Sequence, residues 1–215
     1  DKNIYPLLNK PLLFWAIDLA KNSNLFDRII VSTDSKKYAQ MSTERGAECP
    51  FLREEFFDDN THVAEATASA LIQSQNYFNE RYDTVVQLMP NCPLRSESSL
   101  KEFIINFESM RYPSLISGFE FGWMNPNWAY EEGSQGEPIP LFPERISKRS
   151  QDLPKLFCPT GAIWVTNEFN LLKHKSFYIP GWRFKIMPWS EAVDIDDFSD
   201  LEMAETICFK KNFQD

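Results

Sequence analysis

The stretch Thr84-Val85-Val86-Gln87-Leu88-Met89 is a short apolar run rich in β-branched residues, and it predicts a strand buried within a sheet. Working outward from it, an Ala-rich helix is predicted at residues 63–77 and another helix at 98–110, with a further strand at 113–119. Strands that alternate with helices predict a mostly parallel sheet with helices on both faces. The expected fold class is therefore α/β.

The same alternation continues toward both ends of the chain. Helices are predicted at 11–21 and 35–45, and short strands at 28–32, 47–49, 162–165, 183–187 and 192–195. Residues 120–157 break this rhythm, because they are rich in Trp, Pro, Gly and charged residues and fit no compact βα unit. We predict a single domain over residues 1–215, with residues 120–157 as an inserted arm: a lid, a β-arm or a dimerisation element.

Composition narrows the class of protein. The 215 residues are 43% hydrophobic and 25% charged, which is typical of a folded domain, and the formal net charge is −9. A negative net charge argues against nucleic acid or an anionic membrane as the main partner, although a nucleotide needs only a local basic pocket. No apolar run reaches the roughly 18 residues that a membrane span needs. No signal peptide is visible, so we expect a cytoplasmic protein.

The cysteine pattern argues against a zinc site and against a disulfide framework. None of the four cysteines lies in a C-x-x-C pair, and the chain has only two histidines, His62 and His174. Free thiols in a reducing compartment are the expectation. Cys92 and Cys158 lie beside polar motifs, but no histidine is placed to activate either as a nucleophile.

Polar clusters follow several predicted strands, where ligands bind in open α/β sheets. They lie at residues 32–34, 90–95 and 194–197. In the last of these, apolar and acidic residues alternate, so a strand would place Asp194 and Asp196 on one face with Cα atoms about 7 Å apart. Two such carboxylates can bind one hard cation; alternatively, they only face solvent. Ser199-Asp200-Leu201-Glu202 follows and predicts a capping box that opens a helix.

Read together, these segments resemble the acylneuraminate cytidylyltransferases, the CMP-sialic acid synthetase family. The matching segments are Lys2-Asn3-Ile4, residues 26–34, Phe51-Leu52-Arg53, residues 58–61, residues 87–95, Pro159-Thr160-Gly161-Ala162-Ile163-Trp164 and Asp194-Ile195-Asp196. Their order and spacing agree along essentially the whole chain. The family places a first strand and a basic, Gly-rich phosphate-binding loop before the Lys-Asn pair, and we expect both upstream of Asp1.

The resemblance implies a Rossmann-like nucleotidyltransferase fold and an enzyme that transfers CMP from CTP to a 2-keto sugar acid. The anomeric hydroxyl of the acceptor attacks the α-phosphorus and pyrophosphate leaves. Asp194 and Asp196 would hold Mg²⁺, and Lys2 would contact the phosphates of CTP. No separate general base is evident in the sequence. The implied assembly is a homodimer.

The resemblance also implies two sets of binding residues. The nucleotide set is Lys2, Asn3, Arg53, Asp59 and Thr61. The sugar-acid set is Gln87, Arg95, Arg149, Gln151 and Thr160. Arg149 would act near the sugar, across a dimer in some relatives, and Thr160 stands where many relatives have Asn before Gly-Ala. Most of these residues have a structural alternative: a solvated lysine, a helix cap, a surface ion pair of Arg53 with Glu54 or Glu55, or a loop brace.

Two readings from other classes remain open at this point. The chain could be a degenerate nucleotide-binding module without catalysis, or a dimerisation protein whose Trp-rich arm is its working surface. The joint presence of Lys2, Gln87, Asp194 and Asp196 favours the enzyme. The sequence does not choose among sialic, legionaminic, pseudaminic and octulosonic acids as acceptor.

Overall fold

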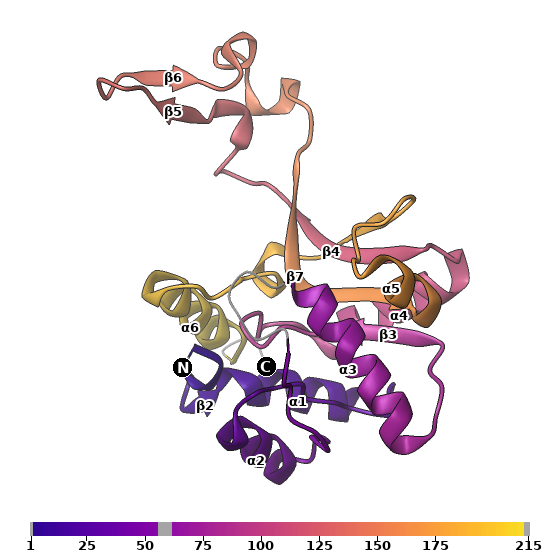
Figure 1. Ribbon diagram of the computed structural model, residues 1–215. Coiled ribbons are helices and arrows are strands. Elements are labelled where there is room, and N and C mark those ends of the chain that lie inside the picture. Colours follow the sequence, from indigo (N-terminus) through magenta and orange to yellow (C-terminus); the bar gives the residue numbers. More distant parts are fainter. Residues whose placement is uncertain (1, 56–61, 213–215) are drawn as a thin grey trace.

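The structure, a computed structural model, describes residues 2–55 and 62–212. Its centre is a four-stranded sheet in the order β3 (Thr84–Gln87), β7 (Phe157–Asn167), β4 (Ser114–Glu120) and β8 (Arg183–Ile186) (Figure 1). β7 runs antiparallel to both of its neighbours, and β4 and β8 are parallel. The expected mostly parallel sheet is therefore corrected to a mixed sheet. The reason is that the chain leaves β4 into the arm and returns along the same strand as β7, as in a long hairpin, without a helical crossover.

Two other predicted strands are reduced to a single bridge. Residues 28–32 and 47–49 pair through one parallel bridge between Ile30 and Glu48. Two backbone bonds flank this bridge, from Val31 to Glu48 at 2.9 Å and from Glu48 to Ile29 at 2.8 Å. The predicted β-branched segment is thus extended and paired, but only over this short length.

The helices lie close to their predicted positions. They are α1 (Leu12–Ser23), α2 (Lys36–Arg45), α3 (Val63–Phe78), α4 (Glu97–Met110) and α6 (Phe198–Asn212). Ser35 and Ser96 cap α2 and α4 with their side chains, and Gly46 ends α2 at a φ of 94°, in the left-handed region that favours glycine. The sequence did not predict the seven-residue α5 (Glu168–His174).

Helices cover both faces of the sheet. On one face, Leu100, Phe103 and Phe107 of α4 pack on Leu115 of β4 and Ile163 of β7. The other face is covered by α3 and α5. Ala64, Ala68 and Leu71 of α3 and Leu171 of α5 share a cluster with Ile116, the next residue along β4. The side-chain alternation of one strand therefore serves two core layers, as expected for an α/β fold.

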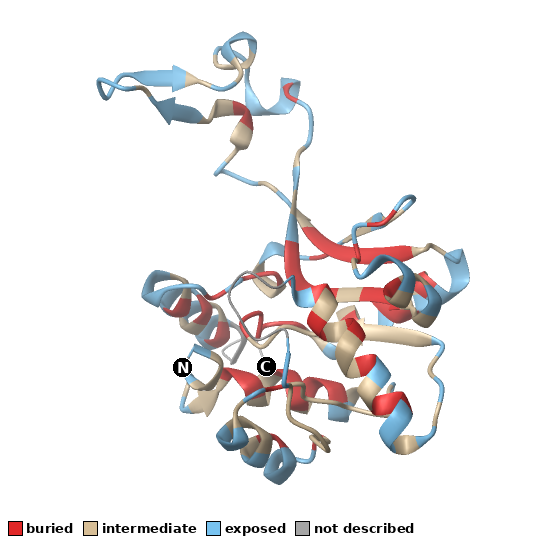
Figure 2. Ribbon diagram, in the orientation of Figure 1, coloured by how far each residue is buried: buried red, intermediate tan, exposed pale blue. Residues whose placement is uncertain are grey.

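The segment between β4 and β7 leaves the body of the molecule as an arm (Figure 1). It contains β5 (Tyr130–Glu132) paired antiparallel with β6 (Pro138–Pro140), and the short turns η2 (Pro126–Trp128), η3 (Pro143–Arg145) and η4 (Ser150–Asp152). Most of its surface is exposed (Figure 2). Asn127 is its buried anchor, donating to Asn125 and to the Pro154 carbonyl and accepting from Arg145 at 2.8 Å.

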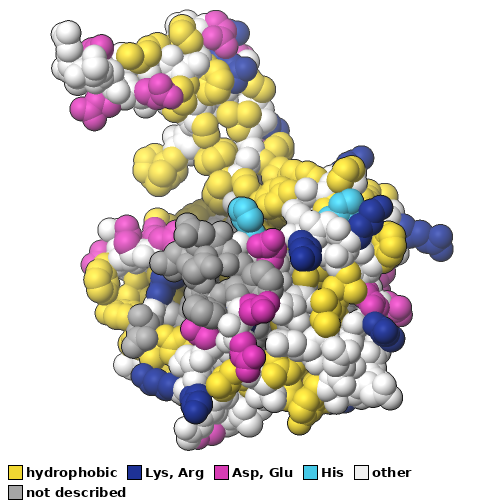
Figure 3. Space-filling model, in the orientation of Figure 1, with side chains coloured by type: hydrophobic (Ala, Val, Ile, Leu, Met, Phe, Trp, Pro, Cys, Tyr) yellow, Lys and Arg dark blue, Asp and Glu magenta, His cyan; other side chains and the backbone are white. Residues whose placement is uncertain are grey.

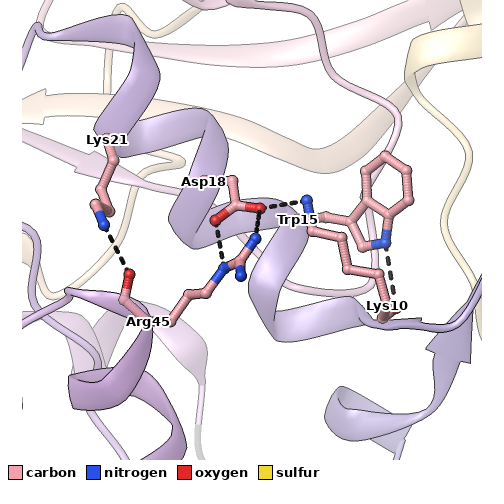
Figure 4. A network of polar contacts seen from close by, with 5 residues as sticks. All are labelled: Lys10, Trp15, Asp18, Lys21 and Arg45. Carbon is pink, nitrogen blue, oxygen red and sulfur yellow. Dashed lines mark hydrogen bonds and ion pairs between the residues drawn. The ribbon is translucent and has the colours of Figure 1, made fainter.

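A network of charges ties the first two helices to the N-terminal hairpin of β1 (Pro6–Leu7) and β2 (Lys10–Pro11) (Figure 4). Arg45 of α2 donates to both oxygens of Asp18 of α1, at 2.7 and 2.6 Å, and Lys10 forms an ion pair with the same carboxylate. Burial alone would raise the pKa of Asp18, but the hydrogen bonds from Arg45 and Lys10 lower it. The charged form is therefore favoured in the folded protein.

We expect Asp18→Asn to lower the free energy of unfolding at pH 7 by about 1–2 kcal/mol, because partly exposed ion pairs contribute modestly. Because the folded pKa is depressed, this contribution is full above the ordinary aspartate value of 3.8 and is lost as the pH falls through the folded value. Urea unfolding of both proteins at pH 7 and at pH 3.5 checks this. The gap between them should narrow at pH 3.5, and a gap that widens there would contradict the assignment. Asp27→Asn, at an exposed aspartate, is the control.

Candidate active site

The two acidic residues that the sequence singled out lie on a loop and not on a strand. Residues 192–197 connect η5 (Trp189–Glu191) to α6 without a strand pairing. Val193 and Ile195 are buried, whereas Asp194 and Asp196 are exposed. The predicted alternation is therefore present, but the predicted strand at 192–195 is wrong. Burial against α1 and α6 produces the alternation here, because Val193 and Ile195 pack in a cluster with these helices.

The start of α6 holds this loop from its C-terminal side. The Asp197 carboxylate accepts from the backbone N–H groups of Ser199 and Asp200, and the Asp200 carboxylate accepts from those of Asp196 and Asp197. This is a reciprocal capping box. It begins at Asp197, two residues before the predicted position at Ser199, because an aspartate satisfies the first free N–H groups equally well.

The structure brings Lys2, Asp194 and Asp196 together. Lys2 lies in η1 (Lys2–Ile4), and its ammonium group donates to Asp196 Oδ1 at 2.6 Å. Burial raises the pKa of Asp194, and the neighbouring Asp196 raises it further, whereas Lys2 lowers it. Two carboxylates that repel each other beside an ammonium group form a site with an unmet demand for positive charge.

Asn91 joins this cluster from the loop that follows β3. Its side-chain amide donates to Asp194 Oδ1, and its backbone carbonyl accepts from Ile195 N at 2.8 Å. Asn91 stood within a quoted motif, but the sequence reasoning gave it no role. The one available signal was its place in a strand-end cluster of polar residues.

Arg95 and Thr160 lie in the interior beneath the acidic loop. Arg95 is 5% exposed and donates through Nη1 to the Ala162 carbonyl of β7. Its Nε and Nη2 atoms have no partner among the described residues. Burial lowers the pKa of Arg95 to about 10, against the opposing effect of Cys92 and Asp194. The Thr160 hydroxyl donates to the Ala192 carbonyl at 3.1 Å, so internal bonds occupy the group that was predicted to meet the sugar.

Gln87 lies at the end of β3, 9% exposed, as predicted for a strand-interior residue. Its amide oxygen accepts from Thr67 of α3 at 2.6 Å, whereas its Nε2 has no partner among the described residues. Cys92, fully buried nearby, has its pKa raised to about 12 by burial and by Asp194. Such a thiol stays protonated, in agreement with the expectation that it is not a nucleophile.

The remaining nucleotide-side predictions have mixed outcomes. Arg53 contacts neither Glu54 nor Glu55 in an ion pair; its Nη2 lies 4.0 Å from Asp34, and its backbone N–H donates to Thr33. Two strand-end clusters therefore meet there. Asn3 is half-buried in η1, next to Lys2. Asp59 and Thr61 lie outside the described residues.

Arg149 and Gln151 are the predicted site residues that the structure places on the arm. Both are exposed, and Arg149 donates to Asp152 at 2.8 Å. Within one chain they are therefore not brought to the cluster around Asp194 on the body. Their predicted contact with the sugar acid is untested by this arrangement.

The donor set at the acidic loop fits Mg²⁺. Among residues 2–55 and 62–212, no group of three or more His, Cys, Asp or Glu side chains could hold a metal ion. Mg²⁺ does not need such a group, since it commonly binds one or two carboxylates and completes its shell with water and phosphate oxygens. The ammonium of Lys2 against Asp196 shows that this place accepts a cation.

Comparison with known families is decisive at this point. The family model described as Cytidylyltransferase matches residues 1–120. The chain belongs to this family. The resemblance predicted from the sequence is thereby confirmed.

Curated relatives of this cytidylyltransferase act on related sugar acids by name. It is 29% identical to the pseudaminic acid cytidylyltransferase of Campylobacter jejuni, over 99% of this chain and 91% of the relative. It is 28% identical to the N-acylneuraminate cytidylyltransferase of Escherichia coli, over 100% of this chain and 50% of the relative. It is also 28% identical to the CMP-N,N'-diacetyllegionaminic acid synthase of Legionella pneumophila, over 96% of this chain and 88% of the relative.

Solved structures support the fold alone. CMP:2-keto-3-deoxy-manno-octonic acid synthetase in complex with CTP aligns with a TM-score of 0.65 at 12% identity, over 98% of this chain and 92% of that one. The fold is thus an α/β nucleotidyltransferase-like fold with a mixed sheet. In the part of the chain that the structure describes, no helix has both the length and the apolar character to cross a membrane.

Proposed function

We propose that this cytidylyltransferase transfers CMP from CTP to the anomeric hydroxyl of a sialic-acid-like 2-keto sugar acid and releases pyrophosphate. The observation that carries the proposal is the meeting of Lys2, Asp194 and Asp196 at one place, together with the family membership. The relatives named for pseudaminic, N-acylneuraminic and legionaminic acids favour a nine-carbon acceptor of this kind. A cytoplasmic location is part of the proposal.

Each residue of the cluster then has a chemical role. Asp194 and Asp196 hold Mg²⁺, which when bound would offset charge on the α-phosphate and acidify the attacking hydroxyl. Lys2 leaves Asp196 and pairs with the phosphates, since an ammonium group meets a stronger anion there. Asn3, Arg53, Asp59 and Thr61 surround the nucleotide.

The sugar-acid side draws on donors that have no partner among the described residues. Gln87 Nε2 and Arg95 Nε and Nη2 are such donors. An acceptor carboxylate or hydroxyl would satisfy them, and a guanidinium can bind a carboxylate bidentately. Thr160 adds its contact through the loop that it holds. Arg149 and Gln151 would reach the sugar from the arm of a second subunit.

Pyrophosphate release from the full-length natural chain tests this function. CTP, UTP, ATP and GTP are compared with Mg²⁺ and a panel of pseudaminic, legionaminic, N-acylneuraminic and octulosonic acids. We expect CTP to be preferred over UTP by at least about 100-fold in kcat/KM, because a hydrogen-bonding pocket can reject a wrong donor edge strongly. Comparable rates with UTP would refute the nucleotide assignment. Binding of CTP without pyrophosphate release, whatever the acceptor, would favour a nucleotide-binding module without catalysis.

A further inference from the structure

The acidic loop lacks the support that a strand would give to Asp194. No ladder runs alongside residues 192–196, so neighbouring strands do not fix the direction of the Asp194 side chain. A carboxylate that binds a metal must be held within a fraction of an ångström to act. Some other group must therefore position it.

Asn91 contacts this segment twice. Its side-chain amide donates to Asp194 Oδ1, and its backbone carbonyl accepts the N–H of Ile195, the next residue. One residue thus fixes both the side chain of Asp194 and the backbone that follows it. Asp194 keeps further lone pairs for a cation, because a carboxylate offers about four acceptor sites.

Asn91 is itself rigidly placed. It is 6% exposed and lies between Pro90 and Pro93, whose rings fix the backbone around it. Cys92 is fully buried, and its N–H donates to Met89 at the end of β3. The sheet therefore transmits its geometry to Asp194 through this loop.

The orientation of the Asn91 amide follows from charge. Turning the amide over would place Oδ1 against a carboxylate oxygen, which repels it, so the N–H₂ group faces Asp194. The cost is a buried Oδ1 with no partner among the described residues. The donor is thus retained although the other half of the amide is left unpaired.

We propose that Asn91 is a positioning residue that holds Asp194 for metal binding, an inference that rests on the proposed function. Asn91 does not touch the reacting atoms; it acts through Asp194. Groups that orient a metal ligand in this way influence metal affinity about 10-fold or more when removed.

Mn²⁺ binding to the full-length chain with CTP and no sugar acid, followed by electron paramagnetic resonance, tests the proposal. Asn91→Ala should weaken Mn²⁺ binding by about 10-fold. Its initial rate with a sugar acid should recover as Mg²⁺ is raised, which a merely structural defect would not produce. The matched control is Asn170→Ala, which removes an amide donor to the Pro113 carbonyl on α5, and it should bind Mn²⁺ as the unchanged protein does.

A second variant covers the case in which Asn91→Ala folds poorly. Asn91→Asp keeps the shape but places a carboxylate against Asp194, so Mn²⁺ should raise its melting temperature more than that of the unchanged protein. Equal Mn²⁺ affinity in Asn91→Ala and the unchanged protein, or an equal shift for Asn91→Asp, would overturn the positioning role alone. Failure of the unchanged protein to bind Mn²⁺ with CTP would overturn the metal role of Asp194, and this inference with it.

Discussion

Asp196→Ala should lower Mg²⁺-dependent pyrophosphate release by about a thousandfold, which corresponds to about 4 kcal/mol in the transition state. The physical reason is the loss of one of two carboxylates that would share a cation with the phosphates of CTP. Stopped assays of pyrophosphate from the full-length chain, with CTP and the preferred sugar acid, measure the effect. Near-normal turnover would remove Asp196 from the metal site.

The fold should survive this substitution. The Asp196 side chain is 72% exposed, and its one described bond goes to Lys2, an exposed pair whose contribution is at most about 1 kcal/mol. The backbone N–H of residue 196 would still donate to the Asp200 carboxylate. Thermal unfolding should therefore be almost unchanged, and Asp27→Ala, at an exposed aspartate elsewhere on the body, should retain full activity.

Local patterns in the sequence predicted those features that local physics determines. The apolar run at 84–89 became β3, and the predicted helices formed because their caps and periodic apolar faces act within a few residues. The alternation at 192–196 correctly separated buried Val193 and Ile195 from exposed Asp194 and Asp196. It could not show whether a neighbouring strand was present, since pairing depends on distant segments.

The direction of β7 was beyond sequence reasoning for the same reason. A parallel strand and an antiparallel one can read alike, and what decides between them is where the arm returns the chain. The short α5 has too few residues for a clear helical period.

The site was predictable residue by residue but not as a geometry. Lys2 and Asp196 are 194 positions apart, and the bond from Asn91 to Asp194 spans 103 positions. The resemblance named the first pair because both stand in family motifs. It gave no role to Asn91, whose importance depends on the missing strand. Thr160 was assigned to the sugar, whereas its hydroxyl holds the Ala192 carbonyl, a contact that only the folded chain reveals.

We expect the natural chain to be a homodimer assembled through the arm. Trp123 is 85% exposed, and Leu141 and Ile139 are also exposed there, so the arm presents apolar surface that its own chain leaves uncovered (Figure 3). Phe142, expected to join this surface, is half-buried under Arg145, whose guanidinium lies 4.5 Å from its ring. Analytical ultracentrifugation at micromolar concentration should give twice the chain mass of 25.1 kDa. A lid folded onto its own subunit would give the monomer mass.

Charge placed on this surface should separate the subunits. Trp123→Glu combined with Leu141→Glu should yield monomers, because burying two carboxylates at an interface costs more than the apolar contacts return. Phe169→Glu, at an exposed aromatic of α5 on the body, is the matched control and should remain a dimer. A double variant that stays dimeric would place the interface elsewhere.

Mixing two inactive variants then asks whether the arm acts on the partner's site. If Arg149 works in trans, a hybrid of Arg149→Ala and Asp196→Ala subunits has one site in which both groups are intact. Random exchange makes half of the dimers hybrids, and each has one such site of two, so the mixture should recover about a quarter of the unchanged rate. If Arg149 worked within its own chain, every site would lack one group and mixing would restore nothing. A dimer without complementation would therefore keep the assembly but confine Arg149 to the arm, where its described partner is Asp152.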